Sequence, residues 1–304
     1  MNIRPILYLF LATIINGCGG GEDGSNNNNN TPFELSCSDA PAFTPSASPV
    51  SYTGTGTPTT TAIVLHGKSG SPNGAHLLPL YTDLQAAGYN IKSLYMPWGH
   101  NGGYPSNNNW NGTLCQAMND ISSVVQAEKN AGNNVVLIGH SMGGAGSLIY
   151  NATTTVNQVD ATITIAPGHF LHKSNTIQQT SAASVTTAKS MVAAGNGDSY
   201  ATFQTRNNGT TQDIDTTANI FLSYHDLEQY PDIVNDVLAE NQGPLYWIGG
   251  DSDNLTTVYG YASLFNTHVP DNTDSTYQTL SGDHKSVVAA ATQNIISWLQ
   301  GVGL

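Results

Sequence analysis

Residues 139–144 read GHSMGG and follow directly on a short apolar run, residues 135–138. A segment rich in small and apolar residues comes next, so the order predicts a strand, a sharp turn and a helix. Ser141 would occupy the tip of the turn. Gly139 and Gly143 suit such a turn, because a Cβ would clash where strand and helix pass close together. The pattern is typical of a nucleophile elbow, which makes Ser141 a candidate nucleophile.

Apolar runs with the spacing of strands and of helices alternate along the chain. Strands are expected at residues 60–65, 90–96, 135–139, 161–166, 244–248 and 277–280. Helices are expected at residues 74–87, 113–130, 145–150, 231–239, 256–265 and 286–299. This alternation predicts an α/β fold with a doubly wound, mostly parallel sheet. Ligands bind at the carboxyl ends of the strands in such sheets, so the residues that follow each strand are the candidates for chemistry.

The composition supports one sizeable core and restricts the partners. The chain has 304 residues, 39% of them hydrophobic, which is enough for at most two domains. Its net charge of −13 comes from 21 acidic and only 8 basic residues. This disfavours nucleic acid and anionic lipid as partners, because both are bound through clustered Lys and Arg. The sequence has no HExxH motif, no paired CxxC motif and no phosphate-binding glycine loop, so we expect no metal site.

The first 17 residues have the pattern of an export signal. Arg4 gives a positive start, and the apolar stretch 6–15 is too short to span a membrane as a helix. Residues 15–18 read INGC and resemble the bacterial lipobox, so we predict that Cys18 is lipidated. Ordinary secretion is the alternative. The prediction implies a protein of the bacterial cell envelope, held at the outer membrane or cell surface only through its lipid.

Residues 18–45 are predicted to form a flexible tether and an N-terminal arm, because their first part is Gly- and Asn-rich and lacks apolar residues. If Cys18 is lipidated, Cys37 and Cys115 remain as a pair in an oxidising compartment. A disulfide between them would tie the arm to the domain, and two unpaired thiols are the alternative. The domain itself is expected to span residues 46–304.

One segment, from about residue 170 to residue 224, breaks the alternation of strands and helices. It contains one helix-like stretch at 183–194, and we interpret the polar residues 196–215 as solvated loop. The whole segment is interpreted as a lid inserted over the carboxyl edge of the sheet.

Three further stretches accompany GHSMGG, and each follows a predicted strand. They read LHGKSG from residue 65, IGGDSDN from residue 248 and SGDHKS from residue 281. From about Thr57 to the C-terminus the chain therefore resembles the α/β-hydrolase superfamily, in which a serine, an acid and a histidine follow strands in this order. The resemblance is to bacterial esterase-like and lipase-like members in general, not to one characterised protein.

The resemblance implies a Ser-His-Asp triad. Ser141 would be the nucleophile, and His284 would be the base that takes its proton. His268, which also follows the acidic candidates, is the alternative base. The acid would be Asp253, from the family pattern Gly-x-x-Asp, with Asp251 as the alternative.

The resemblance also implies an oxyanion hole built from two backbone N–H groups. Met142, directly after the candidate nucleophile, would provide one, and Lys68, after His66 and Gly67, the other. Candidates for the substrate pocket, each with a structural role as the alternative, are His66, Trp98 and His169.

Together these residues predict a serine hydrolase that cleaves a small or polymeric carboxylic ester through an acyl-enzyme, without a cofactor. The same residues would also serve hydrolysis of an amide, a thioester or a polyester. A binding lipoprotein without activity is a further alternative, although a degenerate copy is expected to have lost a member of the triad.

Overall fold

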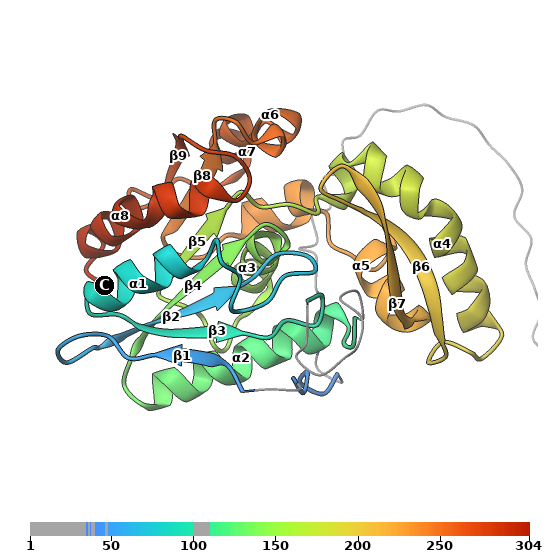
Figure 1. The fold of residues 1–304 in the computed structure, drawn as a ribbon, viewed down its shortest axis with the longest axis horizontal. Helices are drawn as coiled ribbons and strands as arrows, with labels where there is room; N and C mark the ends of the chain where they lie inside the picture. The colour runs from blue at the N-terminus through green and yellow to red at the C-terminus, as the bar shows by residue number, and fades with distance from the viewer. Residues whose placement is uncertain (1–34, 36, 38–39, 46–47, 100–109) are drawn as a thin grey trace, which may run out of the picture. The chain divides into compact units, whose positions relative to one another are not determined.

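Seven strands form the central sheet of the computed structural model, which describes residues 35, 37, 40–45, 48–99 and 110–304 (Figure 1). Contacts divide the chain into residues 1–31, none of which is described, and residues 32–304. The predicted export signal, Cys18 and most of the tether lie outside the described residues.

The order of the strands across the sheet is β1-β3-β2-β4-β5-β8-β9. Their bounds are β1 (Val50–Tyr52), β2 (Thr60–Leu65), β3 (Asn90–Leu94), β4 (Asn134–His140), β5 (Ala161–Ile165), β8 (Leu245–Gly250) and β9 (Thr276–Leu280). Within this sheet β1 pairs antiparallel with β3, and all the other pairs are parallel. The predicted doubly wound, mostly parallel sheet is thus confirmed. The edge strand β1 was not expected, because three residues are too few to show an alternating pattern.

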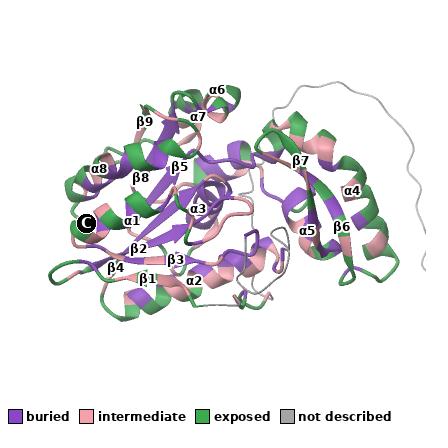
Figure 2. Cartoon of the chain, viewed as in Figure 1, coloured by how far each residue is buried: buried purple, intermediate pink, exposed green. Residues whose placement is uncertain are grey.

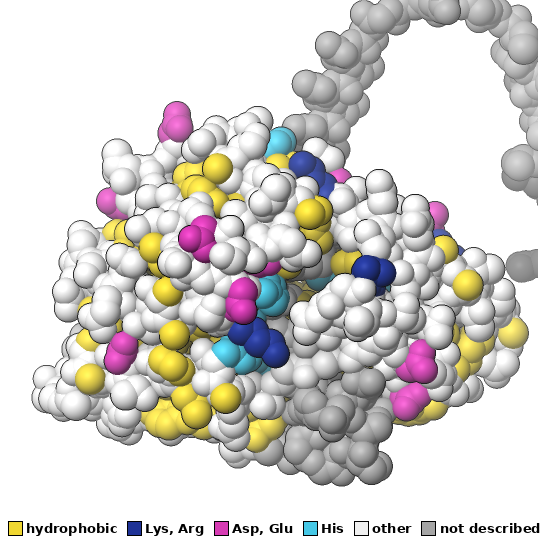
Figure 3. Space-filling model, turned by 45° about the horizontal axis from the view of Figure 1, so that its top comes forward, with side chains coloured by type: hydrophobic (Ala, Val, Ile, Leu, Met, Phe, Trp, Pro, Cys, Tyr) yellow, Lys and Arg dark blue, Asp and Glu magenta, His cyan; other side chains and the backbone are white. Residues whose placement is uncertain are grey.

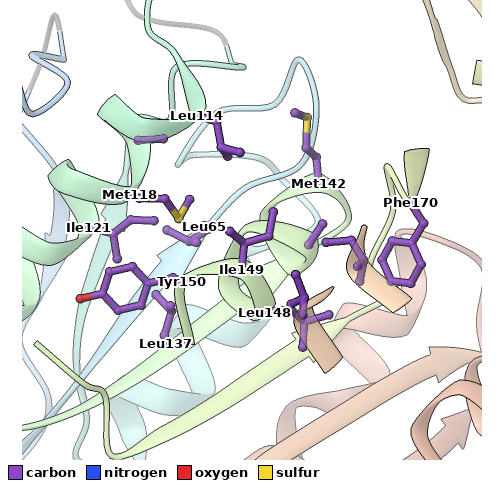
Figure 4. Close-up of a cluster of buried hydrophobic side chains, with 14 of the residues drawn as sticks. Leu65, Leu114, Met118, Ile121, Leu137, Met142, Leu148, Ile149, Tyr150 and Phe170 are labelled. Atoms are coloured by element: carbon purple, nitrogen blue, oxygen red, sulfur yellow. The ribbon is translucent and has the colours of Figure 1, made fainter. Parts of the chain in front are cut away.

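Helices cover both faces of the sheet. On one face α1 (Leu78–Ala86) and α8 (Ser286–Gly301) pack with Ala62 and Val64 of β2. On the other face α2 (Leu114–Asn130) and α3 (Met142–Thr153) pack with Ile63 and Leu65 of the same strand. All six residues of β2 are buried, as expected for a parallel strand covered on both sides (Figure 2). Figure 4 shows how side chains of α2 and α3 meet those of β2 and β4 in the core.

Two of the predicted helices differ from the structure. The expected helix 256–265 consists of α6 (Asn254–Tyr259) and α7 (Tyr261–His268), because Gly260 adopts a left-handed conformation with φ 69° that ends the first helix. The expected helix 231–239 is a turn of π-helix, η2 (Ile233–Val237), followed by a 3₁₀ turn, η3 (Leu238–Glu240).

The segment between β5 and η2 is more ordered than predicted; we call residues 171–225 the insertion. It comprises η1 (Leu171–Lys173), α4 (Asn175–Ala193), β6 (Tyr200–Asn207), β7 (Thr210–Thr217) and α5 (Ala218–His225). The interpretation of residues 196–215 as solvated loop is wrong, because β6 and β7 pair as an antiparallel hairpin. Asn208 and Gly209 form its turn, both at positive φ, the conformation that an Asn-Gly hairpin turn requires.

The insertion has a small hydrophobic core of its own. Side chains from α4, β6 and α5 form it: Ala188, Phe203, Ala218, Phe221 and Leu222. Polar residues dominate the rest of the hairpin, which is why its alternating pattern is weak in the sequence.

The predicted disulfide between Cys37 and Cys115 is present, and it fastens the N-terminal arm to α2. Asn119, one turn further along α2, donates hydrogen bonds to the carbonyl oxygens of Cys37 and Ala40, at 2.9 Å and 2.6 Å. None of the helices in the described part of the chain has the length and apolarity that a membrane span requires.

Candidate active site

Ser141 forms the tip of a tight turn between β4 and α3. Its backbone has φ 58° and ψ −122°, a combination that is costly for a residue with a side chain. A Cβ on Gly139 would overlap the backbone of Gly143, and a Cβ on Gly143 would overlap the carbonyl oxygen of Leu65. The two glycines therefore allow strand, helix and the loop after β2 to meet at the serine, as the sequence predicts.

Three side chains from distant parts of the chain form a continuous line of hydrogen bonds. The Nε2 atom of His284 lies 2.9 Å from the Oγ atom of Ser141, and its Nδ1 atom lies 2.8 Å from Oδ2 of Asp253. A carboxylate only accepts, so Nδ1 carries the proton and Nε2 is free to accept from the serine hydroxyl. This is the arrangement that activates a serine hydroxyl as a nucleophile.

The carboxylate of Asp253 is held in place by its own surroundings. The residue is 3% exposed and directly precedes α6, where its Oδ1 atom accepts a hydrogen bond of 3.0 Å from the N–H of Leu255. One oxygen therefore caps the helix while the other faces His284.

Neither of the alternative triad residues, Asp251 and His268, takes part in the hydrogen bonds from Ser141 through His284 to Asp253. Asp251 is exposed, and its Oδ1 atom accepts hydrogen bonds from the N–H of Gly282 and the hydroxyl of Ser252. The bond from Gly282 is the main reason why the pKa of the Asp251 carboxyl is lowered. Asp251 thus fixes the turn, and His268 is the last residue of α7 and does not line the cavity around Ser141.

Lys68 and Met142, the two predicted oxyanion donors, line the same cavity as Ser141. A Cβ on Gly67 would be 2.8 Å from Cβ of Ser141, so the loop that carries Lys68 contacts the elbow. Met142 is the first residue of α3, and its N–H has no acceptor within the helix. Among the loop bonds of the described residues, the N–H groups of Ser69 and Gly70 are bonded to carbonyl oxygens, but that of Lys68 is not.

A cavity of about 540 Å³ opens above Ser141, a size typical of small-molecule sites. It is lined by the loops at the carboxyl ends of β2, β4, β5, β8 and β9 and by the turn of the β6–β7 hairpin. His169 lines it, with φ 65° and with Nε2 donating to the carbonyl oxygen of Tyr224 at 2.7 Å. Burial lowers the pKa of His169 far below its ordinary value, so the ring is neutral.

The other two predicted pocket residues, His66 and Trp98, do not line this cavity. Both are buried: Nε2 of His66 accepts from the N–H of Met96, and Nε1 of Trp98 donates to the carbonyl oxygen of His66. The ring of Trp98 packs on Gly146 of α3. They stabilise the loop after β2 from beneath, a role that the sequence left open.

No family model matches this sequence, and no curated protein does so either. Solved structures match over most of their length at low identity. A monoacylglycerol lipase from Paleococcus ferrophilus is 18% identical, with a TM-score of 0.58 over 84% of this chain and 100% of that chain. Est1E from Butyrivibrio proteoclasticus is 13% identical, with a TM-score of 0.53 over 84% of this chain and 100% of that chain. MenH from S. aureus is 13% identical, with a TM-score of 0.56 over 84% of this chain and 97% of that chain.

The chain has the α/β-hydrolase fold. The resemblance inferred from LHGKSG, GHSMGG, IGGDSDN and SGDHKS is therefore confirmed at the level of the fold.

Within this α/β-hydrolase fold, the side chain of Lys68 joins the loop after β2 to the insertion. Its Nζ atom donates to Oγ1 of Thr205 at 3.3 Å and to the carbonyl oxygen of Arg206 at 3.2 Å, and it lies 5.7 Å from the ring centre of Trp110. Burial lowers the pKa of Lys68 to about 7. The sequence indicated only a role for the backbone of Lys68, because its partners come from the insertion more than a hundred residues later.

Behind the elbow, two further histidines support the backbone of His284. Nε2 of His140 lies 2.7 Å from the carbonyl oxygen of His284, which can only accept, so His140 is the donor. Nε2 of His76 lies 3.3 Å from Nδ1 of His140. Burial lowers the pKa of His140 well below its usual range, so this histidine is neutral and holds its neighbour by hydrogen bonding alone. No motif marks His76 in the sequence.

Proposed function

We propose that this protein is a serine hydrolase that cleaves carboxylic esters. The observation that carries the proposal is the unbroken line of hydrogen bonds from Ser141 through His284 to Asp253. The line lies at the carboxyl edge of a parallel sheet and opens into a cavity of substrate size.

The proposed reaction has two steps, and each begins with a proton transfer to His284. In the first, Oγ of Ser141 attacks the ester carbonyl while Nε2 of His284 takes the hydroxyl proton and then delivers it to the leaving alcohol. Asp253 keeps the imidazole oriented and stabilises its positive charge. In the second, water attacks the acyl-enzyme with His284 again as the base, the bond between Oγ and the acyl carbon breaks, and the proton passes from His284 to Oγ of Ser141 as the acid leaves. The proposal includes no cofactor.

The N–H groups of Lys68 and Met142 are proposed to bind the oxyanion of both tetrahedral intermediates. Loss of one such donor costs about 10²- to 10³-fold in rate in well-studied enzymes. The position of the Gly67 loop against Ser141 and the free helix N-terminus at Met142 support this assignment.

An ester is favoured over an amide or a thioester by the comparisons. Several similar structures are named as an esterase, a lipase or lipolytic enzymes, at 15–18% identity. A binding protein without activity is disfavoured, because Ser141, His284 and Asp253 are all present and His284 is hydrogen-bonded to both of the others.

The direct test is a rate series on p-nitrophenyl esters of increasing acyl length, with a p-nitroanilide and an insoluble polyester beside them. We expect turnover of at least the short esters by the purified protein and none by Ser141→Ala. Cleavage of the anilide in preference to every ester would replace the proposed reaction by amide hydrolysis.

We also propose that the protein is exported and anchored through a lipid on Cys18. The lipobox-like residues 15–18 support this, as does the disulfide between Cys37 and Cys115, which requires an oxidising compartment. An inhibitor of lipoprotein signal peptidase should cause unprocessed precursor to accumulate in the cell. Unchanged processing would reject the lipid anchor.

The insertion is proposed to act as the lid that shapes the substrate cavity. The turn of its hairpin supports this, because residues 206–209 line the cavity.

A further inference from the structure

Only some of the few Lys and Arg side chains of this acidic protein form ion pairs with carboxylates. Of the 8 basic residues, all except Arg4 are described. Lys92, Lys129 and Lys189 form ion pairs with carboxylates. Among the described residues, the other four have no carboxylate within ion-pair distance: Lys68, Lys173, Arg206 and Lys285.

The unpaired cations gather at the cavity above Ser141. Three of the four, Lys68, Arg206 and Lys285, line it, whereas Lys173 is not among its lining residues. Arg206 lies at the end of β6 and Lys285 follows His284, so the two come from different walls of the cavity. Figure 3 shows Lys and Arg side chains on two sides of the hollow beside the histidines. The chain as a whole has a net charge of −13, so positive side chains without a carboxylate partner at the cavity stand out from its negative average.

The two carboxylates that line the cavity do not use this positive charge. Asp253 is buried and bonded to His284 and to the N–H of Leu255. Asp283 accepts hydrogen bonds from the N–H groups of Lys285 and Ser286, at 2.9 Å and 2.7 Å. Hydrogen bonds from the N–H and the hydroxyl of Ser286, and then from the N–H of Lys285, lower the pKa of Asp283 to about 2. Both acids are satisfied by other donors, and the side chains of Arg206 and Lys285 stay available to a ligand.

We propose that the substrate is an ester that carries an anionic group, which Arg206 and Lys285 bind; this inference rests on the proposed ester hydrolysis. Arg206 provides a planar fork of donors that matches a carboxylate or a phosphate, and Lys285 adds a point charge from the other wall. Lys68 is not assigned to the anionic group, because its Nζ atom is committed to Thr205 and to the carbonyl oxygen of Arg206 and burial lowers its pKa to about 7. The anionic group lies on either the acyl or the alcohol side of the ester, and the test separates the two.

The test uses matched pairs of esters that differ by one carboxylate. Methyl hexanoate and monomethyl adipate place the charge on the acyl side, while ethyl hexanoate and O-hexanoylglycolate place it on the alcohol side. We expect kcat/KM to be about tenfold higher for the charged member of one pair at low salt, and the preference to shrink at 0.5 M NaCl, where charges are screened. Equal rates within both pairs, or faster neutral esters, would overturn the proposal.

Variants then assign the preference to residues. Arg206→Gln and Lys285→Gln should each lower the ratio of charged to neutral kcat/KM about fivefold, the effect of one charge pair near 4 Å in water. Arg206→Lys should keep most of the ratio. Lys189→Gln makes the same change in net charge on exposed α4 and should leave the ratio as it is. An unchanged ratio in both glutamine variants would overturn the assignment.

Binding of the acyl products separates this inference from the proposed function. Calorimetry should show that adipate binds at least fivefold more tightly than hexanoate, and Arg206→Gln or Lys285→Gln should remove the difference. If no ester is hydrolysed but adipate is still preferred, the proposed reaction fails and the anion site stands. If esters are hydrolysed and adipate has no advantage, an acyl-side anion site fails; O-hexanoylglycolate then decides the alcohol side.

Discussion

The Nε2 atom of His284 lies 2.9 Å from Oγ of Ser141, although the two residues are 143 positions apart in the chain. The sheet brings them together, because β4 and β9 are parallel strands whose carboxyl ends lie at the same edge. Asp253 follows β8, the neighbour of β9, and reaches Nδ1 of the same imidazole. The proposed triad is therefore a consequence of strand order.

Asparagine variants of Asp253 and Asp251 test directly which aspartate is the acid of the triad. Asp253→Asn should lower kcat by about 10⁴-fold, because an amide stabilises the wrong tautomer of the imidazole. Asp251→Asn should have only a small effect on kcat, since Asp251 is bonded to Gly282 and Ser252 and not to His284. Steady-state kinetics on one p-nitrophenyl ester measures both variants. The reverse order of effects would assign the role of the acid to Asp251.

His140 is expected to position His284 without touching the substrate. His140→Leu removes the donor to the His284 carbonyl oxygen and should lower kcat about tenfold with little change in KM. His140→Gln, which can still donate at a similar reach, should recover part of the loss. His268→Gln, at the end of α7, is the matched control and should behave as wild type. Equal losses in the leucine and glutamine variants would mean that His140 only fills space.

Buried histidines should make the protein sensitive to mild acid. Burial lowers the pKa of His76 to about 4 and that of His140, His169 and His225 well below the ordinary 6.5. The unfolded chain therefore binds more protons than the folded one below pH 6.5, and stability is lost as the pH falls from about 6.5 toward 4. Urea unfolding at pH 7, 6 and 5 measures the slope of the free energy of unfolding. His76→Asn should reduce this slope below pH 6, and a curve that is flat down to pH 5 would contradict the prediction.

Lys68 should make the free energy of unfolding depend on pH above pH 7. Its pKa is lowered from 10.5 to about 7, so between these values the unfolded chain binds a proton that the folded chain does not. Stability should therefore rise with pH from 7 toward 10, by at most about 1.4 kcal/mol per pH unit from this residue. Lys68→Met should reduce that rise in denaturant unfolding at pH 7, 8 and 9. The same slope in wild type and variant would show that Lys68 is not desolvated.

The sequence predicted the parts of the fold that local patterns determine. Buried parallel strands such as β2 are continuous apolar runs, and the glycines around Ser141 are demanded by close backbone contacts. The positions of His284 and Asp253 followed from the resemblance, which fixes what comes after each strand.

Contacts made between distant segments could not be predicted in the same way. The burial of Trp98 beneath the loop after β2 depends on Gly146, and the bond from Lys68 to Thr205 depends on the hairpin of the insertion. The hairpin itself carried one local signal, the Asn-Gly turn at 208–209, which its polar surroundings obscured. The cationic lining of the cavity likewise appears only when the loops are assembled.

The most direct test of the proposed function is covalent labelling of Ser141 by a fluorophosphonate, read by intact mass and by sequencing of the labelled peptide. The proposal predicts that the folded wild-type protein gains one phosphonyl group at Ser141 and loses its esterase activity in proportion. Ser141→Ala should gain none, and denatured wild type serves as the control for chance reactivity. A wild-type protein that hydrolyses esters while Ser141 stays unmodified, or equal labelling of Ser141→Ala, would contradict the proposal.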